Sequence, residues 1–175
     1  DLIKRYFRDH KKPKNLILIF SNSKFDKPMD SIPLYFDKTF NVINKDSNNP
    51  IIQEMWSIID KEKISKQVVM DLFDGVQTDL EEKVKINSKK ELLIYSYRVA
   101  GTVGLMMSKI LKVNNKEALK GAIDLGIAMQ LTNIARDVCE DKARNRQYVN
   151  HDFSSIKEII NESQIFYDKS FHSIS

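Results

Sequence analysis

The stretch QLTNIARDVCED, residues 130–141, decides the fold, because an apolar helix face and a row of polar side chains run through it side by side. On a helical wheel of roughly 100° per residue, one narrow stripe is apolar and contains Ile127, Leu131, Ile134 and Val138. Asn133, Asp137 and Asp141 follow one another at a spacing of four residues and form a second stripe beside the first. We therefore predict a core helix with a polar margin.

The three polar side chains of this margin are candidate metal ligands. Burying unpaired carboxylates beside a core is costly, so a cation is expected next to them. Carboxylate and amide oxygens are hard donors, and a site that leaves room for water and phosphate oxygens suits Mg²⁺, with Mn²⁺ as the second choice. The metal would bind a phosphorylated substrate. The alternative is a solvated acidic face, since aspartates four residues apart are common on helix surfaces.

Two segments resemble the squalene/phytoene synthase family. Residues 130–148, QLTNIARDVCEDKARNRQY, are similar to its second aspartate-rich motif, and residues 95–107, YSYRVAGTVGLMM, are similar to the helix that lines its substrate tunnel. The resemblance covers residues 48–167 well and residues 1–47 weakly. It implies an all-α isoprenoid synthase helical bundle, with residues 1–175 forming a single domain that is expected to be incomplete at both ends.

The resemblance implies a prenyltransferase that joins two prenyl diphosphates head to head through a cyclopropyl diphosphate intermediate, with Mg²⁺ bound to the diphosphate. YRVAGTVGLMM and QLTNIARD look like the bacterial phytoene synthases, so the first expectation is geranylgeranyl diphosphate giving phytoene in carotenoid biosynthesis. Farnesyl diphosphate giving squalene or dehydrosqualene is the alternative, and squalene formation would also need NADPH. An alternative of another class is a non-catalytic helical scaffold that keeps the fold.

The resemblance also implies roles for individual residues. Asp137 and Asp141 would be catalytic through the metal, and the ring of Tyr95 would face the allylic cation. Contacts with the substrate would come from Gln130, Arg136, Arg146, Tyr148, Val99, Val103 and Gly104. The family pattern R-G-R-x-Y-L-P reads RNRQYVN over residues 144–150, which replaces the glycine and the proline by asparagine.

The family also carries a first aspartate-rich motif, D-x-x-x-D, on a helix that faces the second. Asp26 and Asp30 have this spacing and would complete the set of metal ligands. Pro28 lies between them and would disrupt a helix, so a proline-containing turn explains the same residues equally well. This altered motif is the feature that favours the scaffold alternative.

Composition narrows the class of protein. The net charge of +4 comes from 28 Lys and Arg mixed with 24 Asp and Glu, so a basic nucleic-acid binder is the weakest alternative. Cys139 is the single cysteine, which indicates a reducing compartment and no intrachain disulfide. No apolar run reaches the length of a membrane span. We expect a cytoplasmic protein that binds no nucleic acid, with peripheral membrane contact and oligomeric state left open.

The rest of the sequence shows no sustained β-type alternation and predicts helices. These are expected from Pro50 onward, over residues 65–84, from Ser88 to Ile110 after a Ser88-x-x-Glu91 capping box, from Asn115 to about Lys142, and over residues 151–175. Asp71, Asp74 and Asp79 are expected to be solvated, as is usual for acids on amphipathic helices. The segment LFDGVQTDL also resembles the family's helix ahead of the tunnel, and this resemblance singles out Asp79 as the more regular of the three. Small residues such as Gly75 and Gly104 indicate space for a neighbouring helix or for an apolar substrate.

Overall fold

The computed structural model describes residues 50–174. The contacts of the chain divide it into two compact units, Asp1–Ile58 and Ile59–Ser175. The described part of the first unit belongs to helix α3 (Pro50–Lys61), where Trp56 is buried. The candidate motif at Asp26 and Asp30 lies outside the described residues.

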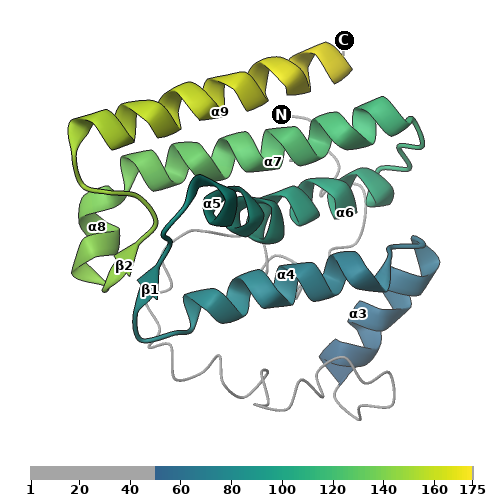
Figure 1. Ribbon diagram of the computed structural model, residues 1–175. Helices are drawn as coiled ribbons and strands as arrows, with labels where there is room; N and C mark the ends of the chain where they lie inside the picture. Colours follow the sequence, from purple (N-terminus) through teal and green to yellow (C-terminus); the bar gives the residue numbers. More distant parts are fainter. Residues whose placement is uncertain (1–49, 175) are drawn as a thin grey trace. The chain divides into compact units, whose positions relative to one another are not determined.

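The second unit is built from helices with one short pair of strands (Figure 1). Its elements are α4 (Lys66–Asp79), β1 (Val84–Lys85), α5 (Lys89–Ser96), the π-helical segment η3 (Tyr97–Gly101), α6 (Thr102–Ile110), α7 (Lys116–Arg136), α8 (Val138–Ala143), β2 (Arg146–Gln147) and α9 (Phe153–Ile174). Helix α7 packs along α9 on one side and against η3 and α6 on the other, and α4 packs against η3 (Figure 1). The predicted all-α class is confirmed. No helix in the described part of the chain is both long and apolar enough to cross a membrane.

The main core cluster lies around the second half of α7. Its buried members are Val84, Leu92, Tyr95, Ile127, Leu131, Ile134, Tyr148 and Ile159. The apolar stripe predicted for α7 is therefore confirmed, and it continues to the buried Val138 on α8. Each such side chain stabilises the fold by roughly 1.5–3 kcal/mol when it leaves water.

Glycines bring the helices of this unit unusually close together. A Cβ atom at Gly104 would lie 2.1 Å from the carbonyl oxygen of Ala122, and one at Gly126 would lie 2.4 Å from the carbonyl oxygen of Ala100. At Gly75 the same atom would lie 2.7 Å from Cγ1 of Val99. These glycines thus serve close helix packing, which is one of the two interpretations that the sequence allows.

The start of α5 confirms the predicted capping box in a shifted form. Ser88 Oγ accepts a hydrogen bond from the backbone N–H of Glu91 at 3.2 Å, and Glu91 Oε2 accepts one from the backbone N–H of Asn87 at 2.9 Å. The return bond thus reaches the residue before the N-cap. From this start the helix continues through η3 and α6 to Ile110, as predicted.

Two predicted helices end earlier than expected. Helix α4 stops at Asp79, and Val84 belongs instead to β1, where it pairs with Arg146 in a parallel register. The long helix predicted up to Lys142 breaks at Asp137, whose φ of −98° and ψ of 14° separate α7 from α8. Aspartate is a weak helix former, and a buried Val138 keeps the apolar period intact across the break, so periodicity cannot reveal it.

Candidate functional site

Asp79, the last residue of α4, is the centre of a cluster of polar side chains. Its Oδ1 atom accepts hydrogen bonds from the hydroxyls of Tyr95 at 2.8 Å and of Tyr148 at 2.7 Å. The two tyrosine rings are buried and stacked, with their centroids 4.9 Å apart. This contact joins α4, α5 and the segment that follows β2 at a single carboxylate.

Arg146 reinforces the same junction. Its Nη2 atom donates a hydrogen bond to the backbone carbonyl oxygen of Asp79 at 2.8 Å. Its backbone pairs with Val84 in the short parallel ladder. The segment after α8, which carries both Arg146 and Tyr148, is therefore held to the end of α4 by side chains and by backbone.

The protonation of this cluster follows from its burial. Burial raises the pKa of the Asp79 carboxyl, and the two tyrosine hydroxyls and Arg146 act in the opposite direction. Burial, followed by the charge of Asp79, raises the pKa of Tyr95 and of Tyr148 far above the ordinary range. Both tyrosines therefore keep their protons and act as donors to Asp79.

Asp137 lies at the break between α7 and α8 and is paired with its neighbour. Its two carboxylate oxygens accept hydrogen bonds from Arg136 Nε at 2.6 Å and from Arg136 Nη2 at 2.7 Å. This pairing lowers the pKa of Asp137, so the carboxylate is charged at neutral pH. The exposed guanidinium of Arg136 is held beside the polar stripe and not turned away from it.

Asp141 stands one helical turn further along, on α8. The backbone bonds from Asp137 N–H to Asn133 O (2.9 Å) and from Asp141 N–H to Asp137 O (2.8 Å) run through the break, so the three stripe residues remain in register. Burial raises the pKa of Asp141, and the charges of Asp137 and Asp79 add to this effect while Arg146 opposes it. The stripe and the Asp79 cluster are thus parts of one electrostatic neighbourhood.

A small hollow lies between α8 and the segment that follows it. It is lined by Asp141, Arg146 and Tyr148 among others, and His151 stands at it as well. His151 has no ligand-like spacing in the sequence, and its place at this hollow could not be read from the chain.

The loop before Arg146 explains how the chain tolerates the loss of the family's glycine. Asn145 has a φ of 58°, in the left-handed region that glycine favours and that asparagine tolerates better than most residues. Its N–H donates to the carbonyl of Lys142 at 3.1 Å and ends α8. The loop can therefore present Arg144 and Arg146 without glycine.

The other predicted site residues lie elsewhere on the same helices. Gln130 and Asn133 are half-buried on α7. Val99 faces Gly75 of α4, and Gly104 faces the backbone of α7. Val103 is half-buried on α6. Contact of any of these with a substrate stays a prediction.

Asp79 is the residue that sequence reasoning left out of the site. It was expected to be solvated, and this expectation is wrong because two buried tyrosines enclose its carboxylate. The neighbouring acids of α4 pair with side chains that are only partly buried. Asp71 accepts a hydrogen bond from the Tyr97 hydroxyl at 3.1 Å, and Asp74 forms an ion pair with Arg98 at 3.3 Å. The position of Asp79 at the end of the helix distinguishes it from them.

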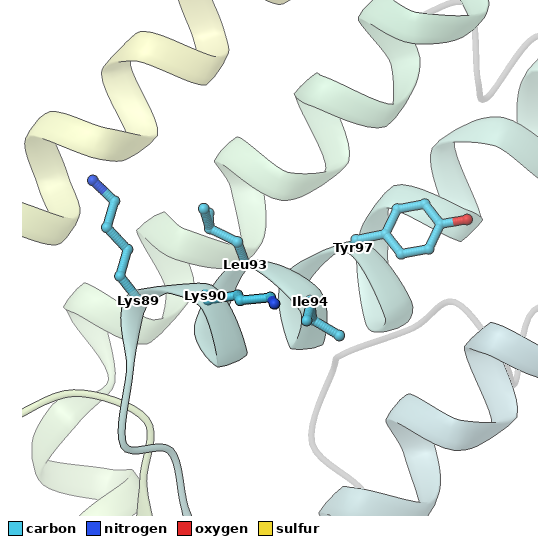
Figure 2. Close-up of a pocket in the computed structure, with 5 residues that line it drawn as sticks. All are labelled: Lys89, Lys90, Leu93, Ile94 and Tyr97. Atoms are coloured by element: carbon cyan, nitrogen blue, oxygen red, sulfur yellow. The ribbon is translucent and has the colours of Figure 1, made fainter.

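A separate depression of about 510 Å³ lies on the surface of α5 (Figure 2). Its lining is formed by Lys89, Lys90, Leu93, Ile94 and Tyr97. Lys89 also pairs with Glu162 of α9 at 2.6 Å. None of the predicted site residues lines this depression, so it is distinct from the Asp79 cluster.

Within residues 50–174, no group of three or more His, Cys, Asp or Glu side chains is arranged to hold a metal ion. Asp137 and Asp141 therefore offer one wall of a site and not a complete set of ligands. Cys139, between them in sequence, is exposed and is not part of a disulfide.

Comparison with known proteins places these features in a family context. The sequence model of the family described as squalene/phytoene synthase matches residues 14–167. The chain is 44% identical to the 15-cis-phytoene synthase of Paracoccus sp. over 84 residues, which cover 48% of this chain and 27% of that protein. It is 53% identical to the phytoene synthase of Thermus thermophilus over 76 residues, which cover 43% of this chain and 26% of that protein. These matches span about a quarter of the length of the two relatives.

A solved structure supports the fold. The squalene synthase HpnC from Alicyclobacillus acidocaldarius is similar with a TM-score of 0.62 and 14% identity, over 87% of this chain and 66% of that chain. At this identity the likeness concerns the fold alone. The predicted isoprenoid synthase helical bundle is confirmed by it.

Proposed function

Because the chain belongs to the squalene/phytoene synthase family, we propose that the protein condenses two prenyl diphosphates head to head, with geranylgeranyl diphosphate as substrate and phytoene as product. The identities of 44% and 53% with two phytoene synthases support this choice. The observation that carries it is the gathering of Asp137, Asp141 and Arg146 where α7, α8 and β2 meet. Paired carboxylates beside arginines suit a metal-bound diphosphate.

The donor set fits Mg²⁺ as one wall of a site. Asn133, Asp137 and Asp141 offer amide and carboxylate oxygens in register along one side of the helix break, and Mg²⁺ commonly binds through one or two carboxylates plus water and phosphate oxygens. Mg²⁺ would supply charge neutralisation of the diphosphate as its C–O bond breaks. The remaining ligands would come from the diphosphate, from water, or from Asp26 and Asp30.

Arg136 would exchange one partner for another when substrate binds. Both oxygens of Asp137 are occupied by the Arg136 guanidinium, so a cation at Asp137 requires that this pair opens. The released guanidinium is exposed and long enough to reach a diphosphate, for which its planar donors are well matched. The position of Arg136 beside Asp137 supports its predicted role in substrate binding.

The Asp79 cluster would hold the diphosphate-binding segment in place. Tyr148 and Arg146 are both tied to Asp79, and Arg146 also stands close to Asp141. Tyr95 contributes to the same anchor, and one face of its ring is covered by Tyr148. An allylic cation would therefore have to meet the other face of Tyr95.

The direct test is incubation of the protein with Mg²⁺ and labelled geranylgeranyl diphosphate, followed by product analysis. We expect phytoene without any added reductant. A parallel incubation with farnesyl diphosphate, with and without NADPH, tests squalene and dehydrosqualene formation. Product from farnesyl diphosphate alone would replace the proposed substrate, and the lack of product from either substrate would support a scaffold.

Substitutions of Asp79 distinguish the effect of its charge on stability from the effect of its hydrogen bonds. We expect Asp79→Leu to lower the free energy of unfolding by about 2–4 kcal/mol, because it leaves two buried hydroxyls without an acceptor. Asp79→Asn keeps the Oδ1 acceptor and removes the buried charge, so it should be at least as stable as the wild type at pH 7. Denaturant unfolding measures both effects.

The pH dependence of the stability of these variants tests whether the buried charge of Asp79 causes the difference. The pKa of Asp79 is raised above its unfolded value of 3.8, so its contribution to stability is fully present below pH 3.8 and is lost as pH rises through the folded pKa. The advantage of Asp79→Asn over the wild type should therefore grow as pH increases from 3.8. A constant difference across this range would contradict a buried, titrating carboxylate.

A further inference from the structure

The ion pair between Arg136 and Asp137 joins two residues that are neighbours in the chain. Adjacent residues of a regular α-helix point about 100° apart and do not face each other. Asp137 departs from the regular helix, with a φ of −98° and a ψ of 14°. Its two carboxylate oxygens meet Nε and Nη2 of Arg136 at 2.6 and 2.7 Å. The break between α7 and α8 therefore allows a contact that a continuous helix disfavours.

The geometry of this pair makes the guanidinium and a metal ion compete for the same carboxylate. An arginine that donates two parallel hydrogen bonds lies directly in front of both carboxylate oxygens. A cation such as Mg²⁺, which binds oxygen ligands at about 2.0–2.1 Å, needs the same space. It would also meet the positive charge of the guanidinium there. Asp137 therefore binds either the guanidinium in this form or a metal ion.

We propose that the Arg136–Asp137 pair is an autoinhibitory contact, which blocks the metal-binding carboxylate of Asp137 until the diphosphate of a substrate takes up the Arg136 guanidinium. This inference rests on the proposed function, because it concerns the order of binding at the same site. The side chain of Arg136 is 65% exposed, and an exposed ion pair is weak. The oxygens of a diphosphate can therefore replace Asp137 as acceptors. Bound diphosphate and bound metal then strengthen each other, and linkage makes this effect reciprocal.

Binding of Mn²⁺ alone to the full chain without substrate, followed by electron paramagnetic resonance, tests the block at Asp137. We expect Arg136→Gln to bind Mn²⁺ about fivefold more tightly than the wild type, a factor at the upper end of the range for exposed ion pairs. Arg144→Gln is the matched control. The charge of Arg144 also acts on Asp137, but the two hydrogen bonds to the carboxylate come from Arg136. This control removes an equal charge and should tighten Mn²⁺ binding by less than about twofold.

Binding of inorganic diphosphate without metal tests the other partner of the pair. We expect Asp137→Asn to bind it about fivefold more tightly than the wild type, because the guanidinium is released from the carboxylate. Glu140→Gln is the control, since the charge of Glu140 also acts on Arg136, and it should tighten binding by less than about twofold. The gain should vanish in the double variant Arg136→Gln/Asp137→Asn, which lacks the released group.

The outcomes distinguish this proposal from the proposed reaction. Equal tightening of Mn²⁺ binding by Arg136→Gln and Arg144→Gln would overturn the block and leave the reaction untouched, because net charge would then explain both. A gain in diphosphate binding that persists in the double variant would overturn the block in the same way. Failure of Arg136→Gln to bind Mn²⁺ would overturn both the block and the metal assignment. The expected binding in a protein that forms no phytoene would support the block and refute the proposed reaction alone.

Discussion

Replacing Asp137 with Ala is expected to lower kcat/KM for phytoene formation by a factor on the order of 1,000, which corresponds to about 4 kcal/mol of transition-state stabilisation. Asp137 is the stripe carboxylate whose pKa is lowered, so it is charged and available to a cation once Arg136 moves. Steady-state rates with varied Mg²⁺ should show that added metal does not restore the activity.

Stability should change little in Asp137→Ala, because the side chain sits at a helix break and is bonded to an exposed arginine. Glu140→Gln is a matched control: it removes a carboxylate that is exposed on α8 and should leave kcat/KM within about twofold, as expected for a surface residue without a role in the site. Equal activity of Asp137→Ala and Glu140→Gln would refute the metal assignment. An unfolded Asp137→Ala would be visible by circular dichroism.

The predictable part of this fold is the part governed by apolar periodicity. The stripe from Ile127 to Ile134 is buried as expected, because one face of a helix must leave water and the sequence records which one. The Ser88 capping box and the extent of α9 follow from equally local signals. Local rules succeed where neighbouring residues determine the outcome.

Asp79 shows what local rules miss. Its acceptor atom is filled by Tyr95 and Tyr148, which lie far apart in the chain and meet only in the folded unit. No spacing within α4 distinguishes it from Asp71 or Asp74. The break at Asp137 is hidden for a related reason, since Val138 continues the buried face. The stripe itself stays in register because backbone bonds bridge the break.

The same cluster links stability to the proposed chemistry. Asp79 accepts a hydrogen bond from the Tyr148 hydroxyl, and its backbone carbonyl accepts one from Arg146. Arg146 in turn opposes the burial that raises the pKa of Asp141. Loss of these hydrogen bonds would release the loop that contains Asn145. The candidate site is therefore supported from α4 and α5, although the sequence places its visible motif on α7 and α8.

Replacing Gly104 with Ala is expected to destabilise the fold by about 3 kcal/mol, at the upper end of the cost of overpacking a core. The added Cβ would lie 2.1 Å from the carbonyl oxygen and 2.9 Å from the carbonyl carbon of Ala122. Both are backbone atoms of α7, so relief requires that α6 and α7 move apart. Thermal unfolding should show a Tm lower by roughly 6–12 °C.

Gly101→Ala is the matched control for this prediction, because it adds the same methyl group to the same continuous helix. Its Cβ would lie 3.0 Å from Cδ2 of Tyr97 and 3.2 Å from Cγ2 of Ile123, which are side-chain atoms that can shift. The gain in helix propensity of about 1 kcal/mol offsets part of that cost. A Tm for Gly104→Ala equal to that of Gly101→Ala would mean that α6 and α7 do not pack backbone to backbone. A Tm much lower for Gly104→Ala than for Gly101→Ala would instead show that Gly104 serves helix packing, whether or not a prenyl chain also contacts it.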